Sequence, residues 1–336
     1  MDKVIIIAEA GVNHNGSIVL AKKLIDAATF SGADYVKFQS FKTEQLVSRH
    51  ARQADYQQNN IVDSDNSQFT MLKKLELSHI QHIELISYCK EKGIKFLSTA
   101  FDNESISFLA SLKLGIWKIP SGEITNYPYL KQIALLNEPV ILSTGMCNMS
   151  DIENALSVLI KFGLQKNQIS ILHCNTEYPT PMEDVNLRAM ISIAEKFGVN
   201  IGYSDHTIGI EVPIAAVALG AKIIEKHFTL DKNMEGPDHK ASIEPSELRK
   251  MVDSIRNIEK ALGSKKKIIT DSERKNINAA RKSIVASTVI NEGDEFSEFN
   301  LTVKRPGTGL TPMLWDKIIG QKSKKNYNPD DLIEIQ

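Results

Sequence analysis

Two histidines, His206 and His227, have the residue type and the sequence context of a metal site. Each stands at the end of a short apolar run. Two imidazoles with open positions suit Mn²⁺, Zn²⁺, Fe²⁺ or Co²⁺, and additional carboxylate and water ligands favour Mn²⁺ or Mg²⁺. Asp205 and Asp238 supply such carboxylates close by in the sequence. The residues alone leave open a purely structural role for both histidines.

Two lysines and a set of hydroxyl side chains predict an anion site. Lys37 and Lys118 lie within apolar runs, where a lysine that points inward needs an anion. Ammonium groups and hydroxyls together form a cradle for phosphate or carboxylate. The hydroxyl side chains at comparable positions are Ser98, Thr99, Ser121, Ser143, Thr144 and Ser204. The alternative is that the lysines pair with Glu9 or Glu123 and stabilise the fold.

Glu9 and Glu123 are the candidate catalytic acids, because each ends an apolar run of the same kind. A carboxylate beside an electrophile can orient a hydroxyl or activate a water molecule as a general base. Either carboxylate can instead serve as the counter-ion of a lysine. The sequence does not separate these two roles.

These residues lie on a repeating pattern of an apolar run followed by a helix-like stretch. The runs are VIIIA, YVKFQ, KFLSTAF, GIWKIPSGE, VILSTG, ISILHCNTEYPTP, VNIGYSDH and KIIEKHF. Such a β-then-α repeat predicts an α/β fold, a (β/α)8 TIM barrel, in which chemistry gathers at the C-terminal strand ends. Because neighbouring strands lie ~4.8 Å apart, His206 and His227 can reach one ion above the barrel mouth.

The chain is longer than one barrel requires. At 336 residues it exceeds the roughly 250 residues of a typical barrel and leaves room for a second domain. We predict a barrel over residues 1–263, a charged linker over 264–281 and a small, mostly β domain over 282–336. A long polar segment, residues 43–67, is predicted to be a lid or binding element, with a disordered insertion as the alternative.

Composition limits the partners and the compartment. The net charge of -1 predicts no nucleic-acid and no membrane partner, so a small anionic substrate would need a local cationic pocket. The three scattered cysteines fit neither a disulfide framework nor a zinc ribbon, and they indicate a reducing cytoplasm. Neither a signal peptide nor a membrane-spanning segment is predicted.

Several motifs in this order resemble the sialic acid synthase family. They are AEAGVNHNGS, VKFQSFK, KIPSGEITNYP, ILSTGM, HCNTEYPTP, GYSDHT and EKHFTLDKNMEGPDH. The tail, ARKSIVASTVINEGDEFSEFNLTVKRPGTGL, resembles the antifreeze-like (SAF) domain of the same enzymes. The resemblance implies a homodimer in which each SAF domain caps the barrel of the partner chain.

The resemblance also assigns roles to residues of this sequence. His206 and His227 match metal ligands, and the metal is usually Mn²⁺ or Mg²⁺. The phosphoenolpyruvate-binding set is matched by Lys37, Thr99, Lys118, Ser121, Ser143 and Ser204. The residues around the sugar and the reacting carbons are matched by Glu9, Gln39, Glu123, Tyr178 and Asp238. Arg305 matches a SAF arginine that reaches the sugar's N-acetyl group across the dimer.

The resemblance predicts a carbon–carbon bond-forming reaction. Phosphoenolpyruvate, N-acetylmannosamine and water would give N-acetylneuraminate and phosphate with C–O cleavage, and Glu9, Glu123 and Lys37 are the predicted catalytic residues. The alternative is a legionaminic acid synthase that uses 2,4-diacetamido-2,4,6-trideoxymannose. Phe38 and Thr176 stand where some N-acetylneuraminate synthases have histidine and asparagine, and this version resembles both another group of N-acetylneuraminate synthases and the legionaminic acid synthases. A metal-dependent hydrolase is less favoured, since a hydrolase of neutral substrates would not need the lysine pair and its hydroxyls. A silent sugar-binding protein is less favoured because acids, lysines and histidines are intact at every expected strand end.

Overall fold

The computed structural model describes residues 3–60 and 66–335. Its N-terminal part is a closed barrel of parallel strands, each paired with its sequence neighbour and β1 with β8. The strands are β1 (Ile5–Gly11), β2 (Tyr35–Ser40), β3 (Lys95–Ala100), β4 (Trp117–Ile119), β5 (Val140–Ser143), β6 (Ile169–His173), β7 (Asn200–Asp205) and β8 (Ile223–His227). The predicted (β/α)8 fold is therefore confirmed.

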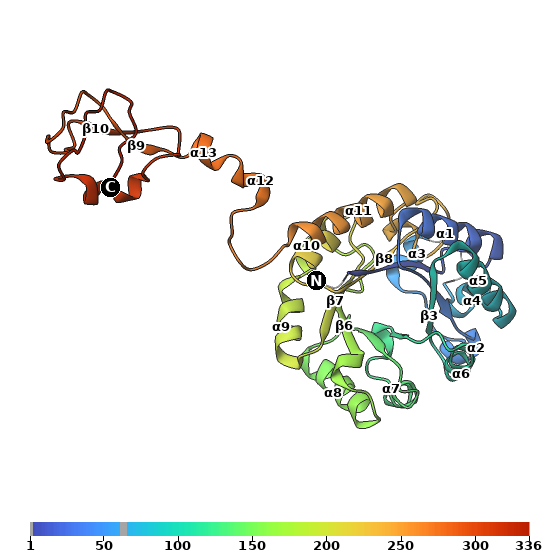
Figure 1. Cartoon of the computed structure of the whole chain (residues 1–336). Coiled ribbons are helices and arrows are strands. Elements are labelled where there is room, and N and C mark those ends of the chain that lie inside the picture. Colours follow the sequence, from blue (N-terminus) through green and yellow to red (C-terminus); the bar gives the residue numbers. More distant parts are fainter. Residues whose placement is uncertain (1–2, 61–65, 336) are drawn as a thin grey trace. The chain divides into compact units, whose positions relative to one another are not determined.

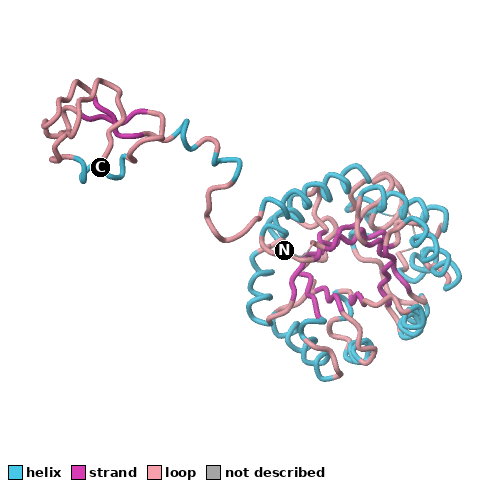
Figure 2. The backbone as a smooth tube through the Cα atoms, viewed as in Figure 1, coloured by secondary structure: helices cyan, strands magenta, loops and turns pink. Residues whose placement is uncertain are grey.

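Helices enclose the ring of strands (Figures 1 and 2). They are α1 (Ile18–Ser31), α5 (His79–Lys92), α6 (Asn103–Leu112), α7 (Tyr127–Ala134), α8 (Met149–Lys161), α9 (Arg188–Phe197), α10 (Glu211–Ala218) and α11 (Pro245–Ala261). Local sequence sets their ends. For α5, Ser78 and Gln81 form a reciprocal capping box, and Gly93 ends the helix at φ +78°.

The connection between β2 and α5 holds the predicted long polar segment. Its described part contains α2 (Thr43–Leu46), α3 (Asp55–Asn60) and, just beyond the segment, α4 (Gln68–Leu75). Arg52 and Ser67 form an isolated antiparallel β-bridge within this connection. Residues 61–65 of the predicted segment lie outside the described residues.

Strand alternation decides which side chains face the barrel interior. Ile7, Leu97, Ile141, Leu172 and Ile223 form one buried cluster, separate from the cluster that packs strands against helices. Because successive side chains point to opposite faces, residues two positions further along each strand also point inward, toward the C-terminal end. An apolar layer thus lies beneath the polar residues of the same strand faces.

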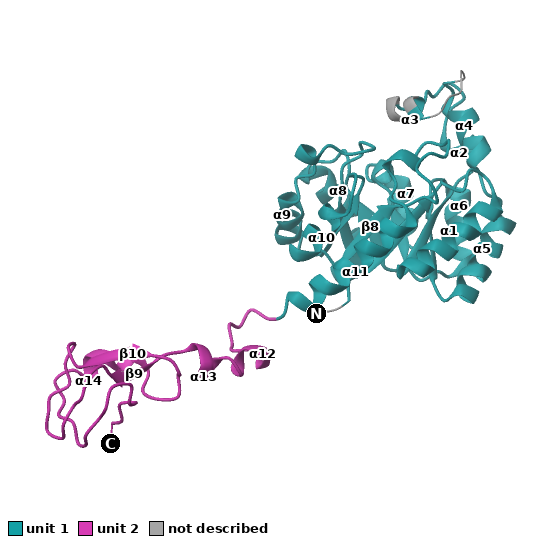
Figure 3. Cartoon of the chain, turned by 90° about the horizontal axis from the view of Figure 1, so that it is seen from above, with its two compact units in different colours: residues 1–263 teal, residues 264–336 magenta. Residues whose placement is uncertain are grey.

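The chain divides into two compact units, residues 1–263 and 264–336 (Figure 3). The second unit has its own apolar core, which includes Ile284, Phe296, Leu301 and Tyr327. Its antiparallel pair is β9 (Ser283–Ala286) and β10 (Leu301–Lys304), followed by α14 (Trp315–Ile318). The predicted linker is exposed, but it contains two single-turn helices, α12 (Asp271–Arg274) and α13 (Ile277–Ala280). Short 3-10 helices occur at Ser121–Glu123, Lys166–Gln168, Met182–Asp184, His239–Ala241 and Pro312–Leu314.

In the described parts of the chain, no helix combines the length and apolar character needed to cross a membrane.

Candidate active site

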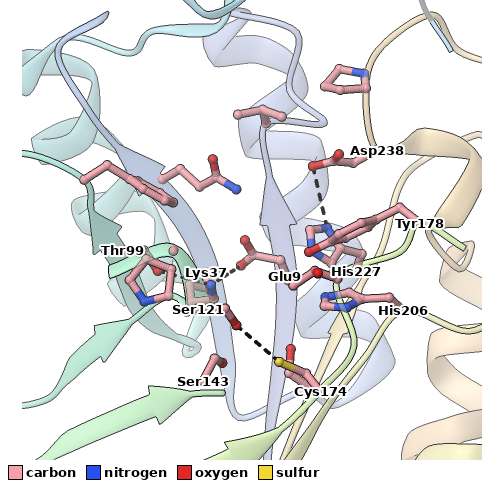
Figure 4. Close-up of a pocket in the computed structure, with 18 of the residues that line it drawn as sticks. Glu9, Lys37, Thr99, Ser121, Ser143, Cys174, Tyr178, His206, His227 and Asp238 are labelled. Atoms are coloured by element: carbon pink, nitrogen blue, oxygen red, sulfur yellow. Dashed lines mark hydrogen bonds and ion pairs between the residues drawn. The ribbon is translucent and has the colours of Figure 1, made fainter. Parts of the chain in front are cut away.

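A cavity of about 250 Å³ opens at the C-terminal ends of the barrel strands. Most of the predicted site residues line it, and Figure 4 shows them converging on one space. Those that line it are Glu9, Lys37, Gln39, Thr99, Lys118, Ser121, Ser143, Tyr178, Ser204, His206, His227 and Asp238. Residues that are far apart in the sequence therefore meet at the C-terminal ends of the strands, as expected for such a barrel.

Two lysines and two glutamates form a buried ionic network on the cavity floor. Lys37 Nζ lies 3.0 Å from Glu9 Oε2 and 3.4 Å from Glu225 Oε2. Lys118 Nζ lies 3.5 Å from Glu225 Oε1. All four side chains are at most 5% exposed, so solvent screens these interactions weakly. The network pairs both lysines with an acid that the sequence analysis did not select, Glu225.

Some of the predicted hydroxyls lie at the charged network, whereas Ser98 hydrogen-bonds to Ser40 and Thr144 donates to the Leu172 carbonyl oxygen. Lys37 Nζ donates to Thr99 Oγ1 at 3.2 Å, and Lys118 Nζ donates to Ser143 Oγ at 2.8 Å. Ser204 Oγ donates to Glu225 Oε1 at 2.9 Å. These groups already share hydrogen bonds around the cavity. An anion that entered would therefore meet donors that are held in place.

The two acids of the network differ in their protonation. Burial raises the pKa of Glu9 to about 7, even though Lys37 opposes the shift. Burial also acts to raise the pKa of Glu225, but Lys118 and Lys37 outweigh it and hold that pKa at about 2. Glu225 is thus a permanent counter-ion, whereas Glu9 gains or loses a proton near neutral pH. A group with a pKa near the working pH is suited to proton transfer.

The two imidazoles face each other across the ends of β7 and β8. Their ring centroids are 5.3 Å apart, and the Tyr178 ring packs 4.1 Å from that of His206. His206 Nδ1 lies 2.5 Å from the Asn175 carbonyl oxygen, which accepts from an Nδ1–H and leaves Nε2 as the ligand nitrogen. Burial lowers the pKa of both histidines, to about 4 for His206, so both rings are neutral. Neutral imidazole is the form that coordinates metals.

The donor set fits a divalent cation with two protein nitrogens. His227 Nδ1 is buried without a hydrogen-bond partner and lies 3.9 Å from Asp238 Oδ2. Burial raises the pKa of Asp238 to about 6, which shows a carboxylate that lacks a compensating positive charge. Within residues 3–60 and 66–335, no group of three or more His, Cys, Asp or Glu side chains is arranged to hold a metal. Water or substrate oxygens would therefore complete the coordination.

Three other predicted residues lie differently from the expectation. Glu123 is not among the cavity-lining side chains of the described residues, and it accepts a hydrogen bond from Asn126 Nδ2 at 2.6 Å. Asp205 points away from the cavity and pairs with Lys226 at 2.5 Å. Arg305 belongs to the second unit, where it is exposed and donates from Nε to the Ala280 carbonyl oxygen.

The alternation of side chains along β8 would have shown from the sequence that Glu225 faces the barrel interior. It lies two residues before His227 on β8, so both side chains face the barrel interior, while Lys226 between them faces the helices. Cross-strand register repeats this arrangement on β7, where Ser204 pairs with Glu225 and Asp205 with Lys226. Ser204 and Glu225 face inward and line the cavity. Asp205 and Lys226 face outward from the barrel interior and are fully buried.

Barrels of this type carry out their chemistry at the C-terminal strand ends, and these charged groups place the chain among the (β/α)8 enzymes that bind a small anion. The NeuB family model matches residues 24–267, and the SAF domain model matches residues 281–334. The chain therefore belongs to the NeuB family. The predicted resemblance is confirmed, and the chain is an enzyme, a phosphoenolpyruvate-dependent nonulosonic acid synthase.

Several relatives are similar in sequence to this chain over most of its length. The N,N'-diacetyllegionaminic acid synthase of Campylobacter jejuni is 56% identical and covers 99% of this chain and 99% of its own. The enzyme of the same name from Legionella pneumophila is 46% identical over 96% of this chain and 91% of its own. The crystal structure of a sialic acid synthetase from Leptospira borgpetersenii in complex with citrate is 36% identical, with a TM-score of 0.71 over 82% of this chain and 90% of that chain.

Proposed function

We propose that this chain is an N,N'-diacetyllegionaminic acid synthase. It condenses phosphoenolpyruvate with 2,4-diacetamido-2,4,6-trideoxymannose and water, and it releases phosphate. The observation that carries this proposal is the 56% identity to a relative of that name over 99% of both chains. This relationship favours the alternative substrate over N-acetylmannosamine, which was the first prediction from the sequence.

The ionic network supports phosphoenolpyruvate as the anionic substrate. Its phosphate and carboxylate would bind Lys37 and Lys118 and displace the Glu9 carboxylate from Lys37, while Glu225 stays as the counter-ion of both lysines. Thr99 and Ser143 already accept hydrogen bonds from the two ammonium groups and lie beside the same space. Held in this way, the methylene carbon would be positioned for attack without a large reorganisation of charge.

The reaction forms one carbon–carbon bond, forms one C–O bond from water and breaks the C–O bond to phosphate. The methylene carbon of phosphoenolpyruvate attacks the aldehyde carbon of the open-chain sugar, whose oxygen becomes a hydroxyl after gaining a proton. Water adds to the cationic carbon that results and loses a proton. The tetrahedral product then expels phosphate as its new hydroxyl loses a proton and becomes the ketone oxygen. Glu9, with a pKa of about 7 and a position beside Lys37, is the base that we assign to the water; Glu123 stays the second candidate.

A divalent metal fits the two imidazoles. His206 and His227 would hold Mn²⁺ or Mg²⁺, which when bound supplies Lewis-acid polarisation of the aldehyde. The carbonyl of Asn175 fixes His206 in the tautomer that leaves Nε2 available. Tyr178 and Asp238 would contact the sugar, because both line the cavity beside the imidazoles.

The second unit would complete the site from a partner chain. We assign the exposed guanidinium of Arg305 to the sugar's N-acetyl group, in a homodimer where each SAF domain caps the other barrel. The match of residues 281–334 to the SAF domain supports this arrangement.

The three cysteines are free, which supports the predicted cytoplasmic location.

Phosphate release from phosphoenolpyruvate and Mn²⁺ tests the proposal when the two sugars are compared under the same conditions. We expect a higher kcat/KM with 2,4-diacetamido-2,4,6-trideoxymannose than with N-acetylmannosamine, and no release after chelation of the metal. A preference for N-acetylmannosamine would instead make the chain an N-acetylneuraminate synthase. Release with neither sugar would refute both substrates.

A further inference from the structure

One wall of the cavity is apolar, in contrast to its charged floor. Met71, Leu72 and Leu75 of α4 line it together with Val12 and Phe101. These five side chains also belong to one cluster, in which Met71, Leu75 and Val12 are buried and the other two are half-buried. The wall therefore has a packed foundation and presents part of its surface to the cavity.

Contacts at both ends of α4 fix the wall in place. Ser67 caps the first turn, and the Glu76 carboxylate accepts from the backbone and hydroxyl of Thr43 at 3.2 and 3.0 Å. The C-terminal end of α4 also rests directly on Gly16: any side chain there would collide with the Lys74 carbonyl oxygen. Because α4 is anchored in this way, the wall is formed before a substrate arrives.

The orientation of the substrate follows from the charged groups. The sugar aldehyde must reach the methylene carbon of phosphoenolpyruvate, which Lys37 and Lys118 hold on the floor. The carbons at the other end of the sugar then extend toward the cavity mouth. The α4 side chains belong to a connection outside the barrel strands, as do Tyr178 and Asp238, and we infer that this end of the sugar lies against α4.

We propose that Met71, Leu72 and Leu75 select the sugar by its apolar substituents, the C6 methyl group and the methyl group of the C4 acetamide. This inference rests on the proposed function. A hydroxyl group placed against such a wall gives up its water without gaining a partner, whereas a methyl group is favoured there. An apolar pocket discriminates against an added hydroxyl by at most about 100-fold, so a preference of roughly 10- to 100-fold is expected.

Substitution of Leu72 tests the inference, because this side chain is half-buried at the margin of the cluster and its change keeps the buried members Met71 and Leu75. Leu72→Gln and the smaller Leu72→Thr place polar atoms on the wall, and Leu72→Met is the matched apolar control. For each variant, kcat/KM is measured with the deoxy diacetamido sugar and with N-acetylmannosamine. We expect the ratio of the two values to fall about tenfold or more in the polar variants and to persist in the control.

The outcomes separate the two proposals. A wild-type preference for N-acetylmannosamine would refute the proposed function. A wild-type preference for the deoxy sugar that survives in Leu72→Gln and Leu72→Thr would refute only the role of the wall. An equal loss with both sugars would likewise overturn it. The KM for phosphoenolpyruvate should stay the same in every variant, because Lys37 and Lys118 lie on the floor.

Discussion

Replacing Lys226 with methionine should destabilise the barrel severely, although Lys226 does not line the cavity. Its ammonium group lies 2.5 Å from Asp205 Oδ2 and 2.5 Å from the Thr207 carbonyl oxygen, and the side chains of the ion pair are 0% exposed. The pair fastens the strand ends that carry His206 and His227. Lys226→Met leaves the Asp205 charge buried without its partner, which costs about 3–5 kcal/mol of the free energy of unfolding.

A second substitution distinguishes the cost of a buried, unpaired charge from the cost of lost packing around the lysine side chain. Asp205 Oδ1 also accepts from the backbone and hydroxyl of Thr207, so Asp205→Asn removes the charge and keeps an acceptor. The double variant Lys226→Met/Asp205→Asn should therefore recover at least half of the loss. Lys232→Met is the control, because its ion pair with Glu247 is 32% exposed on both sides and is worth less than about 1 kcal/mol.

Equilibrium unfolding in urea at pH 7 measures these differences. The explanation fails if Lys226→Met lies within about 1 kcal/mol of the wild type, the range expected for an exposed pair. It also fails if the double variant is no more stable than the single one, because the loss would then come from packing of the lysine stem.

Two further predictions concern the acid on the floor and the second unit. Because burial raises the pKa of Glu9 to about 7, its carboxylate loses its charge below that pH and no longer competes for Lys37. By calorimetry, the metal-free protein should therefore bind phosphoenolpyruvate up to about tenfold more tightly at pH 6.5 than at pH 8; an equal pH dependence in Glu9→Gln would contradict this. Mixing Arg305→Ala chains with Glu9→Gln chains should restore about a quarter of the wild-type activity, since one site of each mixed dimer is intact. No recovery would argue against a cap supplied by the partner chain.

The barrel and most of the residues that line its cavity could be predicted because they depend on local patterns. Each apolar run ends in reactive residues, and parallel strands bring those ends together. Glu225 was overlooked although KIIEKHF contains it, because its partners, Lys37 and Lys118, come from β2 and β4 on other parts of the closed barrel. Asp205 was considered as a possible addition to the metal site, but its neighbour His206 faces the cavity and Asp205 faces the helices.

The apolar wall could not be predicted from local patterns. Met71 and Leu75 pack on Val12 and Phe41, which lie far away in the sequence, so their meeting depends on tertiary structure. The local sequence pattern also did not distinguish the two candidate sugars, because in the proposed orientation they differ in substituents that lie away from the charged floor. Arg305 stays a prediction, since the assignment requires a partner chain.

The residues of the apolar wall and those of the charged floor come from different parts of the chain. The groups proposed to hold phosphoenolpyruvate are distributed over many barrel strands, so a change in any one of them disturbs charges contributed by the others. Met71, Leu72 and Leu75, in contrast, all belong to the single connection between β2 and α5. Under the proposed role of the wall, an ancestral enzyme of this plan could acquire a new sugar by altering or exchanging that one connection while its carbon–carbon bond-forming chemistry stayed constant.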